Sequence, residues 1–246
     1  MNAGATEALY RDDAYQRRCE AHVVGVSDRD GILLDRTVFY PTGGGQPGDA
    51  GTILLGGDLL QVATTVYGDA KADIVHVPVE PIATLEVGTP AVAELDWERR
   101  FSHMRMHTAL HLLCAIVPFP VTGGSIGAEE SRLDFDISDA GAIDKDELTG
   151  RLNALVAEDH PVTTRWISDA ELDANPGLVR TMTVKPPRGS GRIRLVSIGV
   201  DGAIDLQPCG GTHVRSTAEI GALAIPKIEK KGRQNRRIRL AFAGGA

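Results

Sequence analysis

The sequence of 246 residues is poor in aromatic side chains and in cysteine, and it contains no long apolar run. Aromatic residues make up 4% of the chain, so recognition of nucleic acid by repeated base stacking is not indicated. The three cysteines are too few and too scattered for a disulfide framework. No segment approaches the ~20 apolar residues of a membrane-spanning helix, and no signal sequence is visible. These absences favour a reduced, soluble, cytoplasmic protein.

The formal net charge of −7 conceals a strong asymmetry along the chain. Residues 1–175 carry 13 Lys and Arg against 29 Asp and Glu, a balance of −16, whereas residues 176–246 carry 13 against 4, a balance of +9. Seven cations fall within 13 positions: Lys227, Lys230, Lys231, Arg233, Arg236, Arg237 and Arg239. Such a stretch is typical of a surface that meets a polyanion, with a solvated face as the alternative. Partly alternating apolar residues on both sides predict a hairpin that turns at residues 231–235.

Short β-rich runs occupy the first part of the chain. Gly, Pro and Asp separate them, which predicts a small antiparallel sheet or barrel. The expected strands are Ala21–Val26, Gly31–Leu34, Thr37–Tyr40, Gly51–Leu55, Gln61–Tyr67 and Ile74–Val79. The Pro- and Gly-containing stretch Pro78–Pro90 is a candidate linker.

Beyond Asp96 the hydrophobic period changes to that of helices. Helices are expected near Glu98–Val117 and Asp144–Glu158, and a shorter one over Ser168–Asn175 has Ser168 as N-cap and Glu171 completing a capping box. Strands are expected at Arg192–Val200 and Ala203–Gln207, joined by a turn at Asp201–Gly202.

Two pairs of possible metal ligands lie far apart in the sequence. His103, His107 and His111 share one face of the first helix, and an adjacent pair of them can bind one ion. Cys209 and His213 flank three residues that include two glycines. Together they offer a His₃Cys set that suits zinc, although a HxxxH spacing alone is a weak signal and a purely structural zinc is an alternative. The residues between His107 and His111 lack the Glu of the metalloprotease motif, which disfavours peptide hydrolysis.

A glycine-rich segment, FYPTGGGQPGD, runs from Phe39 to Asp49. Three successive glycines permit close approach of a ligand to the backbone, although a hairpin turn is the simpler interpretation. No GxxxxGK[ST] motif occurs in the chain, so this is not a P-loop. Thr37 and Gln46 could donate or accept hydrogen bonds from a small polar substrate.

FYPTGGGQPGD, HTALH, RLDFD, QPCGGTHV and IPKIEKKGRQNRRIRLAF, in this order, resemble the AlaX proteins, freestanding relatives of the alanyl-tRNA synthetase editing domain. The resemblance runs from Leu9 to Phe242 and is to the medium-length type. It implies a zinc-dependent hydrolase that removes serine, and sometimes glycine, from tRNA specific for alanine. It implies one zinc per chain on His107, His111, Cys209 and His213, with His103 outside the motif. Thr37 and Gln46 match catalytic-pocket positions, where Thr37 would read the serine hydroxyl.

The resemblance also implies an α+β fold. A small N-terminal β-barrel, residues 1–92, would precede a two-layer α/β editing domain with the zinc site, residues 93–246. Residues of the basic stretch would contact the acceptor end of tRNA(Ala): Lys227, Lys230, Lys231, Arg233, Arg236 and Arg237. The chain is too short for an aminoacylation domain, and neither ATP nor a membrane is expected as a partner. The alternatives are a non-catalytic tRNA- or RNA-binding protein with a structural zinc, and a synthetase fragment that needs a partner.

Overall fold

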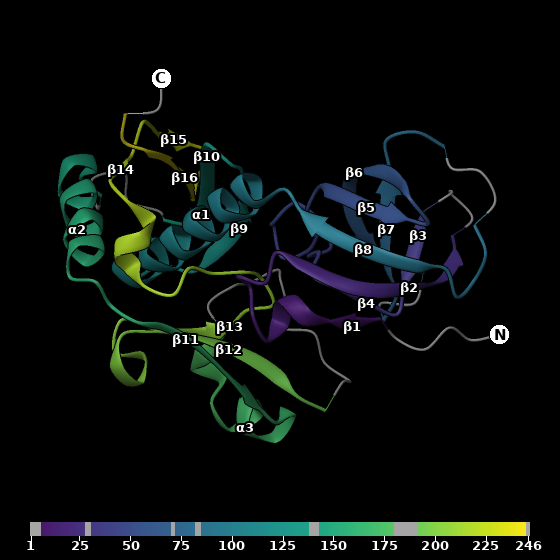
Figure 1. The fold of residues 1–246 in the computed structure, drawn as a ribbon. Coiled ribbons are helices and arrows are strands. Elements are labelled where there is room, and N and C mark those ends of the chain that lie inside the picture. The colour runs from purple at the N-terminus through teal and green to yellow at the C-terminus, as the bar shows by residue number, and fades with distance from the viewer. Residues whose placement is uncertain are drawn as a thin grey trace. The chain divides into compact units, whose positions relative to one another are not determined.

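The computed structural model describes residues 6–27, 31–69, 72–81, 85–137, 143–179 and 191–244 (Figure 1). The chain divides into two compact units, Met1–Phe101 and Ser102–Ala246. The boundary falls within the long helix α1, Trp97–Ile116, which matches the first predicted helix to within a residue at each end.

The first unit contains a closed six-stranded barrel in the order β2-β3-β7-β6-β5-β8, so the predicted barrel is confirmed. All its neighbouring strands are antiparallel. Its strands are β2 Arg18–Val26, β3 Ile32–Leu34, β5 Gly51–Leu55, β6 Asp58–Tyr67, β7 Ile74–Pro78 and β8 Pro90–Leu95. Side chains alternate along β2, where Cys19, Ala21 and Val23 point into a core that includes Phe39 and Ile53. This inward and outward alternation is what half-buried strands require.

One predicted strand of this unit is shorter than expected. Instead of Thr37–Tyr40, the strand β4 covers only Arg36–Thr37 and pairs in parallel with β1, Glu7–Ala8. The following backbone N–H groups bond to side chains: that of Phe39 to Thr37 Oγ1 at 3.1 Å and that of Tyr40 to Asp49 Oδ2 at 2.6 Å. Because these donors are satisfied by side chains, the segment needs no partner strand.

The candidate linker Pro78–Pro90 starts at the last residue of β7 and ends at the first residue of β8. Its residues 82–84 lie outside the described parts of the chain. Strand β8 was not predicted, yet it closes the barrel by pairing with both β2 and β5. Its buried side chains are Ala91, Ala93 and Leu95, and two of these three are a residue type that is depleted in strands.

The described residues of the second unit form two separate sheets and, beyond α1, the helices α2 and α3. The five-stranded sheet has the order β14-β16-β10-β9, and β15 also pairs with β16. Its strands are β9 Val121–Ser125, β10 Glu130–Asp136, β14 Leu223–Ala224, β15 Ile228–Lys230 and β16 Asn235–Phe242. Strands β15 and β16 form the predicted basic hairpin. The three-stranded sheet β11-β12-β13 comprises Val162–Ile167, Ile193–Ile198 and Asp205–Pro208.

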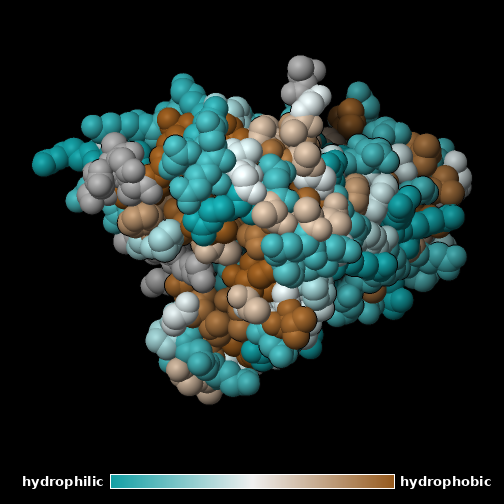
Figure 2. Space-filling view, turned by 90° about the vertical axis from the view of Figure 1, so that its left-hand side faces the viewer, coloured by the Kyte–Doolittle hydropathy of each residue, from teal (hydrophilic) through white to brown (hydrophobic). Residues whose placement is uncertain are grey.

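Helices α2, Lys145–Ala157, and α3, Asp169–Ala174, agree with the prediction. Asp144 caps α2 through its side chain, and Ser168 and Glu171 form the expected capping box of α3. The amide of Asn153 in α2 bonds to both backbone groups of Leu223 and so attaches this helix to β14. Figure 2 looks onto the face that carries α2, where hydrophilic side chains cover much of the surface and hydrophobic areas are visible between them, above all in the lower part of the view. Within the described residues, no helix is both long and apolar enough to cross a membrane.

Candidate metal centre

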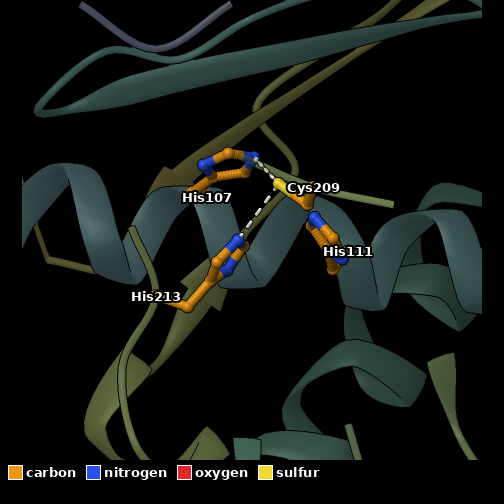
Figure 3. Close-up of side chains that lie close together, drawn as sticks. All are labelled: His107, His111, Cys209 and His213. Atoms are coloured by element: carbon orange, nitrogen blue, oxygen red, sulfur yellow. Dashed lines mark hydrogen bonds between the residues drawn. The ribbon is translucent and has the colours of Figure 1, made fainter. Parts of the chain in front are cut away.

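The four predicted metal ligands come from two elements of the second unit. His107 and His111 lie one turn apart on α1, which places both imidazoles on one face. Cys209 and His213 lie on the loop that follows β13. This strand ends at Pro208, which has no backbone N–H of its own to donate. Figure 3 shows the imidazoles of His107 and His213 directed at the sulfur of Cys209, with His111 beside it.

The ligand atoms of these four residues all lie within 4.8 Å of one another. Cys209 Sγ is 3.4 Å from His107 Nε2 and 3.3 Å from His213 Nε2. A tetrahedral zinc with Zn–N of about 2.0–2.1 Å and Zn–S of about 2.3 Å separates nitrogen and sulfur ligands by about 3.5 Å. The spacing and the chemistry of the donor set therefore fit a zinc ion.

The second ring nitrogen of His111 is held by a carboxylate. Its Nδ1 lies 2.8 Å from Asp205 Oδ2, and Gln207 Nε2 donates to the same oxygen at 2.8 Å. Since a carboxylate accepts, Nδ1 of His111 carries a proton and Nε2 is the atom available to a metal. Asp205 and Gln207 are both buried.

His213 is oriented in the same way by Thr108. The Thr108 hydroxyl donates to Met104 O at 2.9 Å and accepts from the backbone N–H of Val214 at 3.3 Å. The hydroxyl oxygen can accept one more hydrogen bond, and His213 Nδ1 lies 3.1 Å from it. Nδ1 of His213 therefore carries the proton, and its Nε2 faces the other ligands. Asp205, Gln207 and Thr108 were not among the site residues predicted from the sequence. The alternation of 205, 207 and 209 along one strand was a usable signal for the first two.

The protein environment favours the ligand form of the cysteine. Burial alone would raise the pKa of the Cys209 thiol, but His107 and His213 outweigh burial and hold that pKa well below its usual range. Burial, followed by the charge of His107, lowers the pKa of His213. Burial would also lower the pKa of His111, but hydrogen bonds to Asp205 and Cys209 raise it to about 10, so that a metal ion binding at Nε2 would displace a proton. A thiolate is the form of cysteine that binds metals.

A buried arginine shapes the ligand loop. Arg194 on β12 donates from Nη1 to the carbonyl oxygens of Cys209 at 3.1 Å and of Gly211 at 2.8 Å. The backbone N–H of Gly211 in turn points at Cys209 Sγ at 3.4 Å. His103, one turn before His107, is buried and is not a member of the four-residue group.

Thr37 and Gln46, the predicted pocket residues, are fully buried in the first unit. Backbone bonds in both directions join Gln46 to Gly43, and the residues between them, Gly44 and Gly45, have φ of +57° and +85°. These left-handed values favour glycine, and this segment is a tight turn. That Thr37 and Gln46 act in the same site as the metal ligands stays a prediction.

The Thr37 hydroxyl has defined hydrogen-bond partners. His76 Nδ1 lies 3.0 Å from the carbonyl oxygen of Ile32 and must therefore be the protonated nitrogen. Burial lowers the pKa of His76 to about 4, so the ring is neutral near pH 7 and its Nε2 accepts from Thr37 Oγ1 at 2.8 Å. Thr37 Oγ1 also accepts from the Phe39 N–H, which leaves it one acceptor position.

The basic hairpin carries less free positive charge than its sequence suggests. Arg237 forms a bidentate pair with Asp134, and Arg239 pairs with Glu229 and Glu130. Glu229 also pairs with Lys227 at 3.1 Å and Lys231 at 3.8 Å. Arg236 is only 6% exposed. Lys230 and Arg233 are exposed and form no ion pair with any described residue.

Two family models match the chain. Residues 193–239 match the threonyl and alanyl tRNA synthetase second additional domain, and residues 7–99 match tRNA synthetases class II (A). The first match contains Asp205, Cys209 and His213 together with most of the basic hairpin.

Relatives with recorded names extend over nearly the whole chain. The alanyl-tRNA editing protein AlaX-M of Methanosarcina acetivorans is 35% identical over 244 residues, which cover 95% of this chain and 97% of the relative. AlaX-L of Pyrococcus horikoshii is 32% identical over 94% of this chain and 57% of its own length. The alanine–tRNA ligase of Pyrobaculum neutrophilum is 36% identical, but this chain covers only 25% of it. The match to AlaX-M from end to end shows that the chain belongs to the AlaX family of alanyl-tRNA editing proteins.

Proposed function

We propose that this protein is a trans-editing deacylase that hydrolyses the ester of Ser-tRNA(Ala), and also of Gly-tRNA(Ala), with one zinc ion bound by His107, His111, Cys209 and His213. The observation that carries the proposal is the full-length match to AlaX-M in a chain whose four His and Cys ligands meet within 4.8 Å. An aminoacyl ester is already activated, so orienting it contributes much of the catalysis that hydrolysis needs.

The ligand set defines what the metal centre contributes. When bound, zinc would supply a fixed positive charge beside the substrate. If all four protein ligands held the ion at once, they would leave no position for a water molecule, which favours an organising role for the metal over activation of water. The chain's own contribution is the pair of hydrogen bonds that His111 Nδ1 donates to Asp205 and His213 Nδ1 donates to Thr108, which keep the ligand nitrogens aimed at one point.

Thr37 is proposed to recognise serine in the aminoacyl pocket, with Gln46 as the second pocket residue. The Thr37 hydroxyl gives its proton to His76 and accepts from Phe39, so a substrate group that binds the remaining position must donate. A serine hydroxyl can donate there, and the side chains of alanine and glycine have no such group. A Thr37 hydroxyl that can only accept a further hydrogen bond therefore supports selection of Ser-tRNA(Ala) over the correctly charged Ala-tRNA(Ala).

The basic hairpin is proposed to hold the phosphates of the tRNA acceptor end. The exposed Lys230 and Arg233 at its tip are the cations best placed for this role, with Lys227 and Lys231 next to them. Arg236 and Arg237 would contribute mainly by fixing the strand, because one is buried and the other is bound to Asp134.

The test is deacylation of purified Ser-, Gly- and Ala-tRNA(Ala), with metal content measured on the same samples. The wild type should contain about one zinc and hydrolyse Ser-tRNA(Ala) but not Ala-tRNA(Ala). His107→Ala should lose both zinc and activity, whereas His22→Ala, which changes a histidine that is 61% exposed in the first unit, should keep both. A zinc-loaded wild type that leaves Ser-tRNA(Ala) intact would refute the proposal.

A non-catalytic RNA-binding protein with a structural zinc is the second candidate function. The closed set of four protein ligands favours it, because structural zinc sites have this form. The same samples separate the two candidates. A structural role predicts tRNA binding without ester hydrolysis, and a chelator would then unfold the second unit without changing the rate of ester loss.

A further inference from the structure

Strand β13 carries more of the metal centre than the cysteine that follows it. Its register with β12 pairs Asp205 with Ile198 and Gln207 with Val196, and the backbone N–H of Cys209 continues this ladder by bonding to Arg194 O. Side chains alternate along a strand, so Asp205, Gln207 and Cys209 share one face. Leu206, on the opposite face, packs against the small core of Ile167, Leu172, Ile193 and Leu195.

The contacts on this face converge on one ring. Asp205 Oδ2 lies 2.8 Å from His111 Nδ1 and receives a second N–H bond, also of 2.8 Å, from Gln207. Asp205 is 1% exposed, so water does not compete for the carboxylate. From these contacts we infer that Asp205, held in place by Gln207, is a positioning residue that fixes the tautomer and the plane of His111 and thereby sets the affinity of the metal centre. The inference rests on the proposed metal site, and it extends the ligand motif to D-x-Q-x-C-x-x-x-H, residues 205–213.

The physical reason is that Asp205 determines which nitrogen of His111 carries the proton and limits rotation of the ring. An imidazole whose Nδ1–H is bonded to a carboxylate has its Nε2 lone pair free and more basic. Without that acceptor the ring can turn or change tautomer, and a metal ion must then supply the free energy that selects the binding form. Loss of such a partner typically lowers metal affinity by about 10- to 100-fold.

Asp205→Asn is the direct test, because asparagine keeps the size of the side chain and removes its charge. The matched control is Asp201→Asn, which removes the same charge from an exposed residue of the same unit. Asp201 has a φ of +54°, and asparagine tolerates that conformation. The zinc dissociation constant is measured by competition with a chromophoric chelator, and circular dichroism checks the fold.

The expected result is zinc binding that is weaker by about 10- to 100-fold in Asp205→Asn and unchanged in Asp201→Asn. Equal zinc affinity in Asp205→Asn and wild type would overturn the inference while leaving the proposed function intact. A wild type that binds no zinc would instead remove the metal centre from the proposed function. Should Asp205→Asn fail to fold, ¹⁵N NMR of the zinc-loaded wild type decides. A proton on Nδ1 of His111 supports the inference, and a metal-bound Nδ1 overturns it.

Discussion

Replacing Arg100 by leucine should destabilise the first unit by about 3–5 kcal/mol, because it would leave the buried carboxylate of Asp49 without its partner. Arg100 and Asp49 are 0% and 1% exposed. The guanidinium donates to both Asp49 oxygens from Nε, at 3.0 and 2.9 Å, and again from Nη2. It also donates to the carbonyl oxygens of Val38 at 2.7 Å and Ala14 at 2.9 Å.

The magnitude follows from what the substitution leaves behind. Asp49 would keep the N–H of Tyr40 as a hydrogen-bond donor, and the carbonyl groups of Ala14 and Val38 would each lose one. A buried charge that has lost its partner lowers the stability of the fold by far more than the intact ion pair raises it. The double variant Arg100→Leu with Asp49→Leu should therefore lose much less stability than the sum of the two single variants.

The assay exploits the two tryptophans, of which Trp97 lies in the first unit and Trp166 in the second. In a Trp166→Phe background, fluorescence during urea unfolding reports on Trp97 alone, three residues from Arg100. Arg36→Leu is the control, because the Arg36–Glu7 pair is 50% and 56% exposed and its loss should cost about 1 kcal/mol or less. A loss for Arg100→Leu no larger than that of the control would refute the reasoning, as would additive losses in the double variant.

Three further outcomes are expected. Thr37→Val should slow hydrolysis of Ser-tRNA(Ala) by about tenfold or more and affect Gly-tRNA(Ala) far less, since an unsatisfied polar group costs about 1–3 kcal/mol; equal losses on both substrates contradict the role of Thr37. Replacing Lys230, Lys231 and Arg233 together by alanine should raise KM and leave the zinc content unchanged. The slope of the logarithm of the tRNA binding constant against the logarithm of the salt concentration should become shallower by about 2–3. The same measurement on Lys145→Ala with Arg151→Ala, on α2, is the control, and wild-type affinity in the triple variant would place tRNA binding elsewhere. Because the pKa of His76 is about 4 in the folded state against 6.5 unfolded, the unfolded chain binds more protons between these values. Stability of the first unit should be complete above pH 6.5 and fall towards pH 4, with a contribution of about 1.4 kcal/mol per pH unit at the steepest point. His76→Phe should remove this component, and an unchanged pH slope in that variant would contradict the neutral, buried state of the ring.

Local signals predicted the elements whose formation depends on nearby residues. Helix α3 follows from Ser168 and Glu171, which bond to each other's backbone within one turn. The basic hairpin follows from alternating apolar residues around a polar turn. Strands β9, β10 and β11 were not expected. Strands β10 and β11 pair with β16 and β12, which lie far away in sequence, whereas β9 pairs with the neighbouring β10. Residues 130–136 of β10 pair with residues 235–241 of β16, for example. Two glycines in β9, Gly123 and Gly124, also hide its strand character.

At the candidate site, the ligand types and their spacing predicted a metal site, and the resemblance to the AlaX proteins selected the four residues that meet. The support around them depends on register and on burial, which composition does not reveal. Asp201 and Asp205 both precede Cys209 by an even number of residues, so only the start of β13 separates Asp205, which bonds to His111, from the exposed Asp201. For the basic stretch, the sequence suggested more free positive charge than the structure shows. Asp134, Glu130 and Glu229, which lie on neighbouring strands, pair with part of its cations.

Closure of the barrel has a consequence for association with other chains. An edge strand of an open sheet exposes a row of backbone donors and acceptors that can pair with an extended segment of another chain, and this pairing is a common route to aggregation. In the order β2-β3-β7-β6-β5-β8, the last strand pairs with the first, so the barrel has no edge strand. In the second unit, the five-stranded sheet ends in β9 on one side and in the two-residue β14 and the charged β15 on the other. On the side of β14 and β15, the short and charged strands discourage intermolecular pairing.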